Sequence, residues 1–168
     1  MKYMNVSITG LRGRQHAALS GIITTDEVKT SRCHIKMLCG DYLTYEKKSN
    51  QSGGSPHCRV CGDKTKIENI SYILTSCSAY EELRNRKVQE LENLSSNVNK
   101  TFDFQEIRSN DIDLTQFLLD PTSINLKQRI NPSDPLLSKF FSISRSYCNL
   151  VNTRRINILK TEQKKNQE

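Results

Sequence analysis

Two cysteines three positions apart, followed directly by a glycine, place the strongest constraint on how this chain can fold. They are Cys58 and Cys61 in the stretch PHCRVCGDK, with Gly62 after the second cysteine. A tight turn of this kind can direct two sulfur atoms and nearby backbone N–H groups toward one point. Structural zinc sites commonly take two of their four ligands from such a turn. The pattern therefore predicts that further ligands lie downstream.

The downstream half of this site is only partly present. Cys77 is the cysteine within reach, and a histidine five positions before it would complete a set of four ligands. That position holds Tyr72, so that the pattern is C-x2-C-x10-Y-x4-C. A phenol with its ordinary pKa near 10 is a poor zinc ligand at neutral pH. We therefore predict zinc as the cofactor and Cys58, Cys61 and Cys77 as ligands, with the fourth ligand undetermined.

Other residues compete for the fourth position. His57 adjoins Cys58 in an awkward geometry for sharing the metal, while Cys33, His34 and Cys39 would reach the site only from a neighbouring helix. A cluster of buried thiols without metal is the alternative interpretation. A redox-active Cys-x-x-Cys is a third one, but the chain lacks the βαβ context in which such motifs occur.

Helical spacing of apolar residues dominates the rest of the chain. Residues 24–43 form one predicted helix, with Thr25 as its N-cap. A second helix is predicted to begin at a capping box of Ser78 and Glu81 and to run to about Leu94.

The C-terminal half continues this pattern. A short helix is predicted over residues 110–121, and the longest one begins at Asp134 and Pro135 and keeps one apolar face to about Lys160. The side chains expected on that face are Leu137, Phe140, Phe141, Ser144, Cys148, Val151 and Ile158 or Leu159. Because strand and hairpin signals are missing from the sequence, the predicted fold class is mainly α. We expect a small irregular helical domain with a Cys-x-x-Cys knuckle and a long C-terminal helix.

The chain divides into four predicted segments. Residues 1–23 are expected to be a poorly ordered N-terminal segment, and residues 24–94 a helix followed by the knuckle module. Residues 95–160 are expected to be a helical tail region, and residues 161–168 a disordered tail. Within the second segment, the polar, Gly/Ser-rich stretch 46–56 is expected to be a loop that leads to the knuckle.

The charge of the chain favours a polyanionic partner. Its net charge is +7, and from residue 127 onward nine lysines and arginines stand against three acids. Such cations would contact phosphates of RNA or DNA, which gives salt-sensitive binding with little sequence preference. The residues predicted to make these contacts are Arg59, Lys64, Lys66, Arg145, Arg154, Arg155 and Lys160. For any one of them, a solvated helix surface is the simpler interpretation.

The sequence also bears on compartment and on the remaining candidate residues. No apolar run approaches the roughly 20 residues that span a bilayer, and the N-terminus lacks the apolar segment of a signal peptide. We expect an intracellular protein of nucleus or cytoplasm with no membrane partner and no small-molecule substrate. In a reducing compartment its six cysteines would be ligands or buried thiols. His16 and His34 are expected at the surface or an interface. Separately, Tyr42, Phe140, Phe141 and Cys148 are expected in the core.

The segment CRVCG…YILTSCSAYEELR resembles the zinc-binding segment at the C-terminal end of reverse transcriptases from non-LTR retrotransposons. That family segment typically reads Cys-x2-Cys, then His-Ile-Leu-x2-Cys-Pro, with an arginine a few positions on. The matching residues are Cys58, Cys61, Ile73, Leu74, Cys77 and Arg84. Tyr72 occupies the histidine position of the family, and Ser78 occupies its common proline position.

The resemblance extends over most of the chain, from about residue 24 to 160. IKMLCGDYLT (residues 35–44) looks like the helix that precedes the knuckle in these polymerases, and residues 114–126 and 134–160 look like the tail that follows it in some animal elements. The resemblance implies a zinc-knuckle module that grips template RNA or target DNA. It also implies the rest of a reverse transcriptase as a protein partner.

The catalytic residues of those enzymes are missing from this chain. A polymerase palm needs neighbouring aspartates to hold two Mg²⁺ ions, and the sequence contains neither an Asp-Asp pair nor the Asp/Glu/His set of an apurinic-type endonuclease. The acidic pairs Asp26–Glu27 and Glu81–Glu82 fall at predicted helix N-termini, where the helix dipole accounts for them. We therefore expect a module without catalysis of its own. The alternative is a fragment of a decayed element that binds no metal and serves at most as a helical protein-interaction module.

Overall fold

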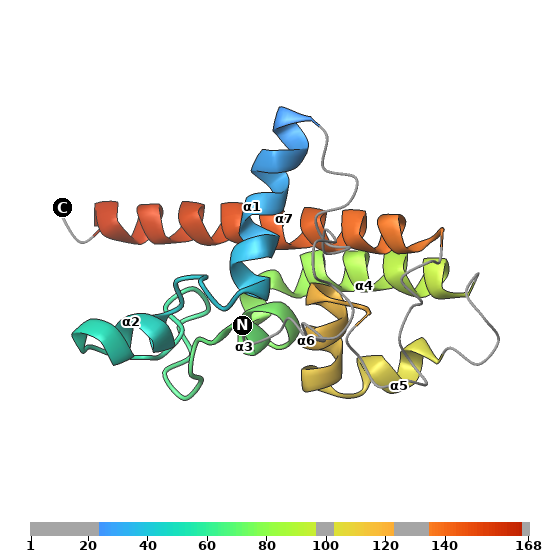
Figure 1. Cartoon of the computed structure of the whole chain (residues 1–168). Coiled ribbons are helices and arrows are strands. Elements are labelled where there is room, and N and C mark those ends of the chain that lie inside the picture. The colour runs from blue at the N-terminus through green and yellow to red at the C-terminus, as the bar shows by residue number, and fades with distance from the viewer. Residues whose placement is uncertain (1–23, 97–102, 123–134, 166–168) are drawn as a thin grey trace.

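The structure is a computed structural model that describes residues 24–96, 103–122 and 135–165. It is mainly α, as the sequence predicted (Figure 1). Its helices are α1 (Thr25–Leu38), α2 (Tyr45–Ser52), α3 (Ile70–Thr75), α4 (Glu81–Ser95), α5 (Phe104–Arg108), α6 (Asp111–Leu119) and α7 (Leu137–Lys165), with a 3-10 turn η2 (Ser78–Tyr80) before α4. Extended pairing within the described residues is limited to one antiparallel bridge between His57 and Ile67. Residues 1–23, His16 and Asp134 lie outside the described residues.

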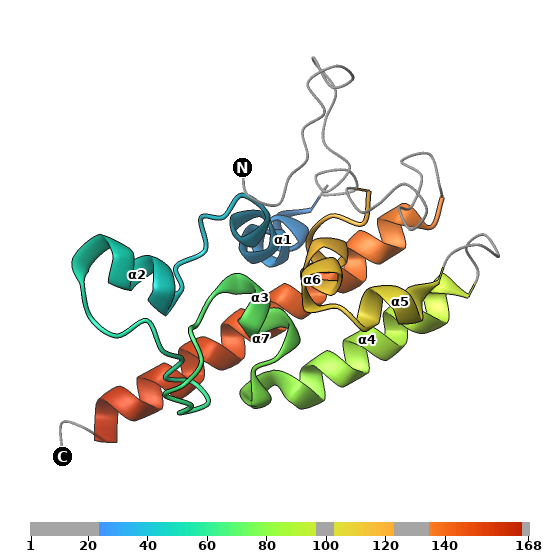
Figure 2. The same ribbon diagram turned by 90° about the horizontal axis from the view of Figure 1, so that it is seen from below.

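The long helix α7 organises the arrangement of the others. α1 crosses α7, whereas α4 lies alongside the first part of α7 in both views (Figures 1 and 2). α6 packs against α3, α5 and α7, so that the shorter helices close the core below. Because α7 packs against both α1 and α4, the predicted segments 24–94 and 95–160 share one core. None of the described helices combines the length and the apolar character that crossing a bilayer requires.

The apolar face of α7 lies in this core as predicted. Its buried residues include Leu137, Phe140, Phe141, Ser144, Cys148 and Val151, and Ile158 and Leu159 are partly buried. Phe117 of α6 stands edge-on between Phe104 and Phe140, with ring centroids 5.4 and 5.5 Å away. The Tyr147 hydroxyl donates to the carbonyl oxygen of Leu74 at 2.7 Å, which ties α7 to α3. Each fully buried side chain of this size contributes roughly 1.5–3 kcal/mol through its removal from water.

The first helix is shorter than predicted and begins with a different cap. The Thr24 hydroxyl accepts from the Glu27 N–H at 3.2 Å, and the Glu27 carboxylate accepts from the Thr24 N–H, which forms a capping box one residue before the predicted cap. The helix ends at Leu38 because Gly40, at φ +74°, turns the backbone into the left-handed region. Tyr42 lies beyond the helix and is buried, as predicted for the core.

Residues 46–56, predicted as a loop, contain most of helix α2. Thr44 caps this helix by accepting from the Lys47 N–H at 3.1 Å, and Gly53 ends it at φ +75°. No side chain of α2 is buried. The helix therefore has no apolar stripe, and its caps are the local signals that define it.

The other helix boundaries depart from the prediction in three places. Ser78 and Glu81 form no capping box, because Ser78 belongs to the turn η2 and α4 begins without a side-chain cap. α5 was not predicted; its cap is Asp103, whose carboxylate accepts from two backbone N–H groups. Residues 161–165, predicted as part of a disordered tail, continue α7 as helix.

Candidate metal centre

The Cys-x-x-Cys turn is held by backbone pairing with the segment that follows it. The N–H of Cys58 donates to the carbonyl oxygen of Lys66 at 3.0 Å, next to the bridge between His57 and Ile67. Gly62 adopts φ +73°, which residues with a Cβ rarely accept. These contacts fix the knuckle as a short closed loop.

Helix α3 brings the third cysteine to this loop. Asn69 caps α3 by accepting from the Tyr72 N–H at 2.8 Å. At the other end of α3, the N–H of Cys77 donates to the carbonyl oxygen of Tyr72 at 2.8 Å. Arg84 of α4 donates from Nη1 to the carbonyl oxygen of Cys77 at 3.0 Å. The backbone on both sides of the Cys77 side chain is thereby fixed.

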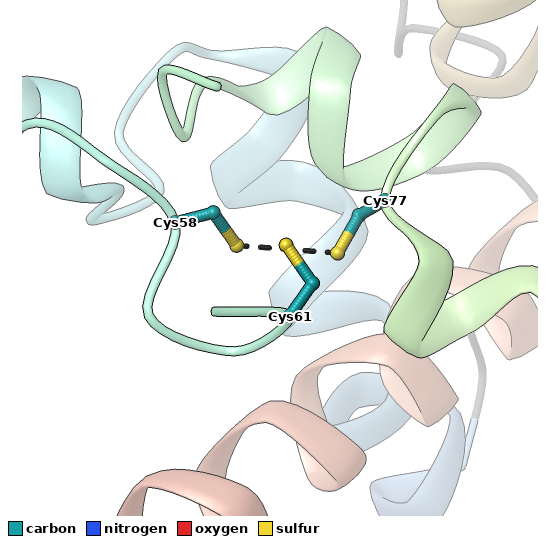
Figure 3. A group of neighbouring side chains, drawn as sticks. All are labelled: Cys58, Cys61 and Cys77. Carbon is teal, nitrogen blue, oxygen red and sulfur yellow. Dashed lines mark hydrogen bonds between the residues drawn. The ribbon is translucent and has the colours of Figure 1, made fainter. Parts of the chain in front are cut away.

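The three predicted cysteine ligands converge on one point (Figure 3). Their sulfur atoms lie within 4.8 Å of one another, and those of Cys58 and Cys77 are 3.9 Å apart. In a tetrahedral site with Zn–S bonds of about 2.3 Å, neighbouring sulfur atoms are about 3.8 Å apart. Cys58 and Cys77 are buried, and Cys61 is half-buried. The cluster can therefore supply three ligands to a single metal ion.

Hydrogen bonds shift the pKa values of the Cys58 and Cys77 thiols in opposite directions. The N–H of Cys61 donates to the sulfur of Cys58, and the N–H of Ala79 donates to the sulfur of Cys77. The hydrogen bond from Cys58 lowers the pKa of the Cys77 thiol, while the same bond, followed by burial, raises the pKa of Cys58. The thiolate is the form of cysteine that binds metal ions.

Tyr72 reaches the cluster from α3. Its hydroxyl oxygen lies 3.2 Å from the sulfur of Cys61. Burial, and then the hydrogen bond with Cys61, raises the pKa of the Tyr72 phenol above its ordinary value. A phenol that keeps its proton at neutral pH can donate a hydrogen bond to the Cys61 sulfur.

The other candidates for the fourth position lie outside the converging group. Cys33 donates from its sulfur to the carbonyl oxygen of Cys148 at 3.3 Å, at the contact of α1 with α7. His34, expected at the surface or an interface, is fully buried, and burial lowers its pKa to about 4. Cys39 caps the end of α1, and His57 forms part of the bridge at the knuckle. Cys148 is a buried thiol, as predicted.

Glu68 is the residue at this centre that sequence reasoning missed. It is fully buried, and its Oε1 accepts from the N–H of Tyr45 at 3.0 Å and from Nη2 of Arg155 at 2.7 Å. Its Oε2 lies 3.4 Å from the sulfur of Cys58. The one local signal is an acid that lies between two isoleucines, Ile67 and Ile70. Its partner in α7 is 87 positions away along the chain.

The cations predicted to contact phosphates fall into two groups. Arg145 is buried, and Arg155 is largely buried, where it pairs with Glu68 and lies over the rings of Tyr42 and Tyr45. Their packing accounts for these two arginines without a nucleic acid. The exposed members of the predicted set are Arg59, Lys64, Lys66, Arg154 and Lys160.

A surface cleft of about 690 Å³ lies beside the cysteine cluster. Arg59 and Lys64 line it from the knuckle, and Glu162 lines it from α7. The guanidinium of Arg59 stands 5.2 Å from the ring centre of Tyr45, which holds this side chain in place. The cleft thus combines two cations of the knuckle with one acid.

Comparison with known proteins assigns no family to this chain. No family model, no curated protein and no solved structure matches it. The reverse-transcriptase resemblance therefore stays a prediction from the sequence.

Proposed function

We propose that this chain is a non-catalytic nucleic-acid-binding module organised by a zinc centre. The observation that carries the proposal is the convergence of the Cys58, Cys61 and Cys77 sulfur atoms within 4.8 Å. Thiolates are soft ligands that favour zinc, and a tetrahedral arrangement suits their separations. Tyr72, which stands where a fourth ligand is expected, would donate a hydrogen bond to the sulfur of Cys61.

Zinc in this position would fix the knuckle against the α3–η2 junction. Arg59 and Lys64 would then stand at set positions around the cleft, where they can contact phosphate oxygens. Contacts of this kind position a nucleic acid without reading its sequence. The exposed cations Lys66, Arg154 and Lys160 would add to the electrostatic attraction.

The same proposal includes an origin in the C-terminal part of a non-LTR retrotransposon reverse transcriptase. Its support is the order of the motifs along the chain, from the helix before the knuckle to the long helix after it. The contact of Arg84 with the carbonyl oxygen of Cys77 gives a structural reason for an arginine at that position of the motif.

Metal analysis of protein purified without chelators tests the metal centre. We expect about one zinc ion per chain in the wild type and loss of this zinc in Cys77→Ser. Cys39→Ser is the matched control, because Cys39 is a half-buried cysteine outside the cluster. Loss of zinc in the control alone would contradict the proposed ligands.

Binding measurements with structured RNA and with duplex DNA test the second part. We expect binding at low salt that weakens steeply at moderate salt, because released counterions drive phosphate contacts. Absence of binding to both nucleic acids at micromolar protein and low salt would exclude the nucleic-acid function.

A metal-free helical protein-interaction module is the second candidate. The observation that favours it is Tyr72, whose raised pKa makes a phenolate ligand costly. Without metal, Cys58 and Cys77 hydrogen-bond to each other, and Cys61 hydrogen-bonds with the Tyr72 hydroxyl. Sub-stoichiometric zinc, together with circular dichroism unchanged by a chelator, would favour this candidate.

A further inference from the structure

α1 and α7 form a second surface groove, of about 380 Å³, on the side of α7 that carries Asn149 and Asn152. The α1 wall of this groove carries Lys29, Arg32 and Lys36. Their spacing of three and then four residues places all three on one face of the helix. The groove therefore has a row of cations on one wall and side-chain amides on the other.

The charges of this groove are largely unopposed. Asp41 is the one acid among its lining residues, and its carboxylate lies 3.4 Å from the ammonium of Lys47. Lys29 makes an ion pair with Asp26 in which both side chains are highly exposed, a kind of pair that contributes little. Within the part of the chain that the structure describes, Arg32 and Lys36 have no ion-pair partner. The groove is therefore suited to a polyanion.

Apolar side chains and a further lysine extend this surface. Leu43 and Ile156 line the groove, and their exposed fractions are 54% and 41%. Lys160 follows Ile156 by four residues on α7, which places its exposed side chain on the same helix face one turn farther on. A nucleic acid in the groove would thus meet cations for its phosphates and apolar surface for its bases.

The groove adjoins the cleft at the knuckle across one aromatic ring. Arg155 lines the groove, and its guanidinium lies 5.4 Å from the ring centre of Tyr45. Arg59, which lines the knuckle cleft, lies 5.2 Å from the same ring centre. Arg59, Tyr45 and Arg155 therefore form the boundary between two neighbouring cation-lined surfaces.

We propose that the α1–α7 groove is a second nucleic-acid contact, so that one single strand of RNA or DNA occupies both the groove and the knuckle cleft. The inference rests on the proposed nucleic-acid function and adds a site to it. Single-strand-binding surfaces commonly combine a positively charged groove with side chains on which bases rest, and cover roughly 4–16 nucleotides. The row of α1 cations supplies the charge that such a strand requires.

Fluorescence anisotropy with labelled oligouridine and oligothymidine tests this site on the full chain. The wild type should gain affinity between strands of roughly 5 and roughly 16 nucleotides, because only the longer strand reaches both surfaces. The double variant Arg32→Gln/Lys36→Gln should lose most of that gain and bind the longer strand about tenfold more weakly. Its slope of log affinity against log salt should fall by about 1.4, or about 0.7 for each lost phosphate contact.

The matched control is the double variant Arg86→Gln/Lys139→Gln. It removes the same charge from exposed positions on α4 and α7 that line neither surface. We expect it to bind the longer strand within about twofold of the wild type. Circular dichroism of both double variants checks that the fold is kept.

Three outcomes separate the alternatives. An equal loss of affinity in both double variants would show a net-charge effect and overturn the proposed site. Binding of polyglutamate can be measured in the same way. If Arg32→Gln/Lys36→Gln keeps its oligonucleotide binding but loses polyglutamate binding, the groove takes an acidic protein segment, and the proposed nucleic-acid contact is overturned. Absence of binding by the wild type would instead overturn the proposed nucleic-acid function itself, and with it this contact.

Discussion

The first half of α7 packs through apolar and aromatic side chains, whereas its second half meets the knuckle through a charge. Phe140, Phe141 and Tyr147 are fully buried among residues of the surrounding helices. Farther along, Arg155 forms its ion pair with Glu68 beside the cysteine cluster. The helical core thus draws its stability from many interchangeable contacts, while the knuckle depends on a few polar atoms. The two regions should therefore respond differently to metal, to charge substitutions and to acid.

Removal of the proposed zinc ion should have the largest effect, and that effect should be confined to the knuckle. With a chelator, amides of residues 57–77 should lose most of their protection against hydrogen exchange, because binding energy of the ion is folding energy for the loop that holds it. Amides in the first half of α7 should keep theirs. Hydrogen exchange followed by mass spectrometry measures both regions in one sample. An equal loss of amide protection in both regions would contradict the difference expected between them.

Loss of the buried carboxylate should destabilise the fold nearly as strongly. Glu68→Ala leaves the Arg155 guanidinium, whose side chain is 14% exposed, without its partner. Breaking a buried pair in this way costs about 3–5 kcal/mol of unfolding free energy. Glu82→Ala is the matched control, because Glu82 forms an exposed 3.9 Å pair with Arg154 and should change stability by less than about 1 kcal/mol. Urea unfolding distinguishes the two, and similar losses would disprove the role of the buried pair.

Acid should act on the helical core through His34. Burial lowers its pKa from 6.5 to about 4, an effect that the charge of Arg145 strengthens and that the carbonyl of Leu118 and the charge of Asp120 oppose. Because the folded pKa lies below the unfolded one, the unfolded chain binds the proton first as the pH falls. The free energy of unfolding therefore keeps its full value above about pH 6.5 with respect to His34. It falls by about 3 kcal/mol as the pH is lowered toward 4.

The comparison of wild type with His34→Leu isolates this acid effect. Between about pH 7 and about pH 4.5, the unfolding free energy of the wild type should fall relative to that of the variant, because the variant lacks the titrating group. Loss of the proposed zinc ion at low pH would affect both proteins alike and would cancel in the difference. A constant difference across this range would show that His34 does not titrate on unfolding.

Replacing the phenol at the cluster should have the smallest effect in free energy. Tyr72→His offers an imidazole that is largely neutral at pH 7 and should raise zinc affinity about tenfold, or 1.4 kcal/mol. Tyr72→Phe removes the hydroxyl near Cys61 and should lower the affinity about tenfold. Competition with a chelating dye measures both variants. An unchanged affinity in Tyr72→His would show that the spacing of the ligands has been interpreted wrongly.

The predictable parts of this fold are those that depend on local patterns. The apolar face of α7 follows from helical periodicity, and the three-residue spacing of Cys58 and Cys61 identifies the turn that meets Cys77. Asn110, which begins the predicted short helix, accepts from two backbone N–H groups at the start of α6. In each case, residues close together in the sequence determine the structure.

The parts of the fold that the sequence did not predict either make contacts with residues far away along the chain or, like α2, bury no side chain. α2 buries no side chain, so that apolar periodicity could not reveal it. His34 looks like a surface residue in the sequence, yet the packing of α6 and Phe141 around it makes it part of the core. The pairing of Glu68 with Arg155 joins the segment before α3 to α7, and the two are neighbours only in the folded chain.

That ion pair limits how the protein can be divided. The stretch from Pro56 to Cys77 contains every cysteine of the cluster and looks like a portable motif. If it were excised, or if the chain ended before residue 155, Glu68 would lose the guanidinium that neutralises it next to the Cys58 sulfur. A fragment that keeps this ion pair must therefore include residue 155, and a graft into another scaffold would need an arginine supplied from outside the motif to restore it.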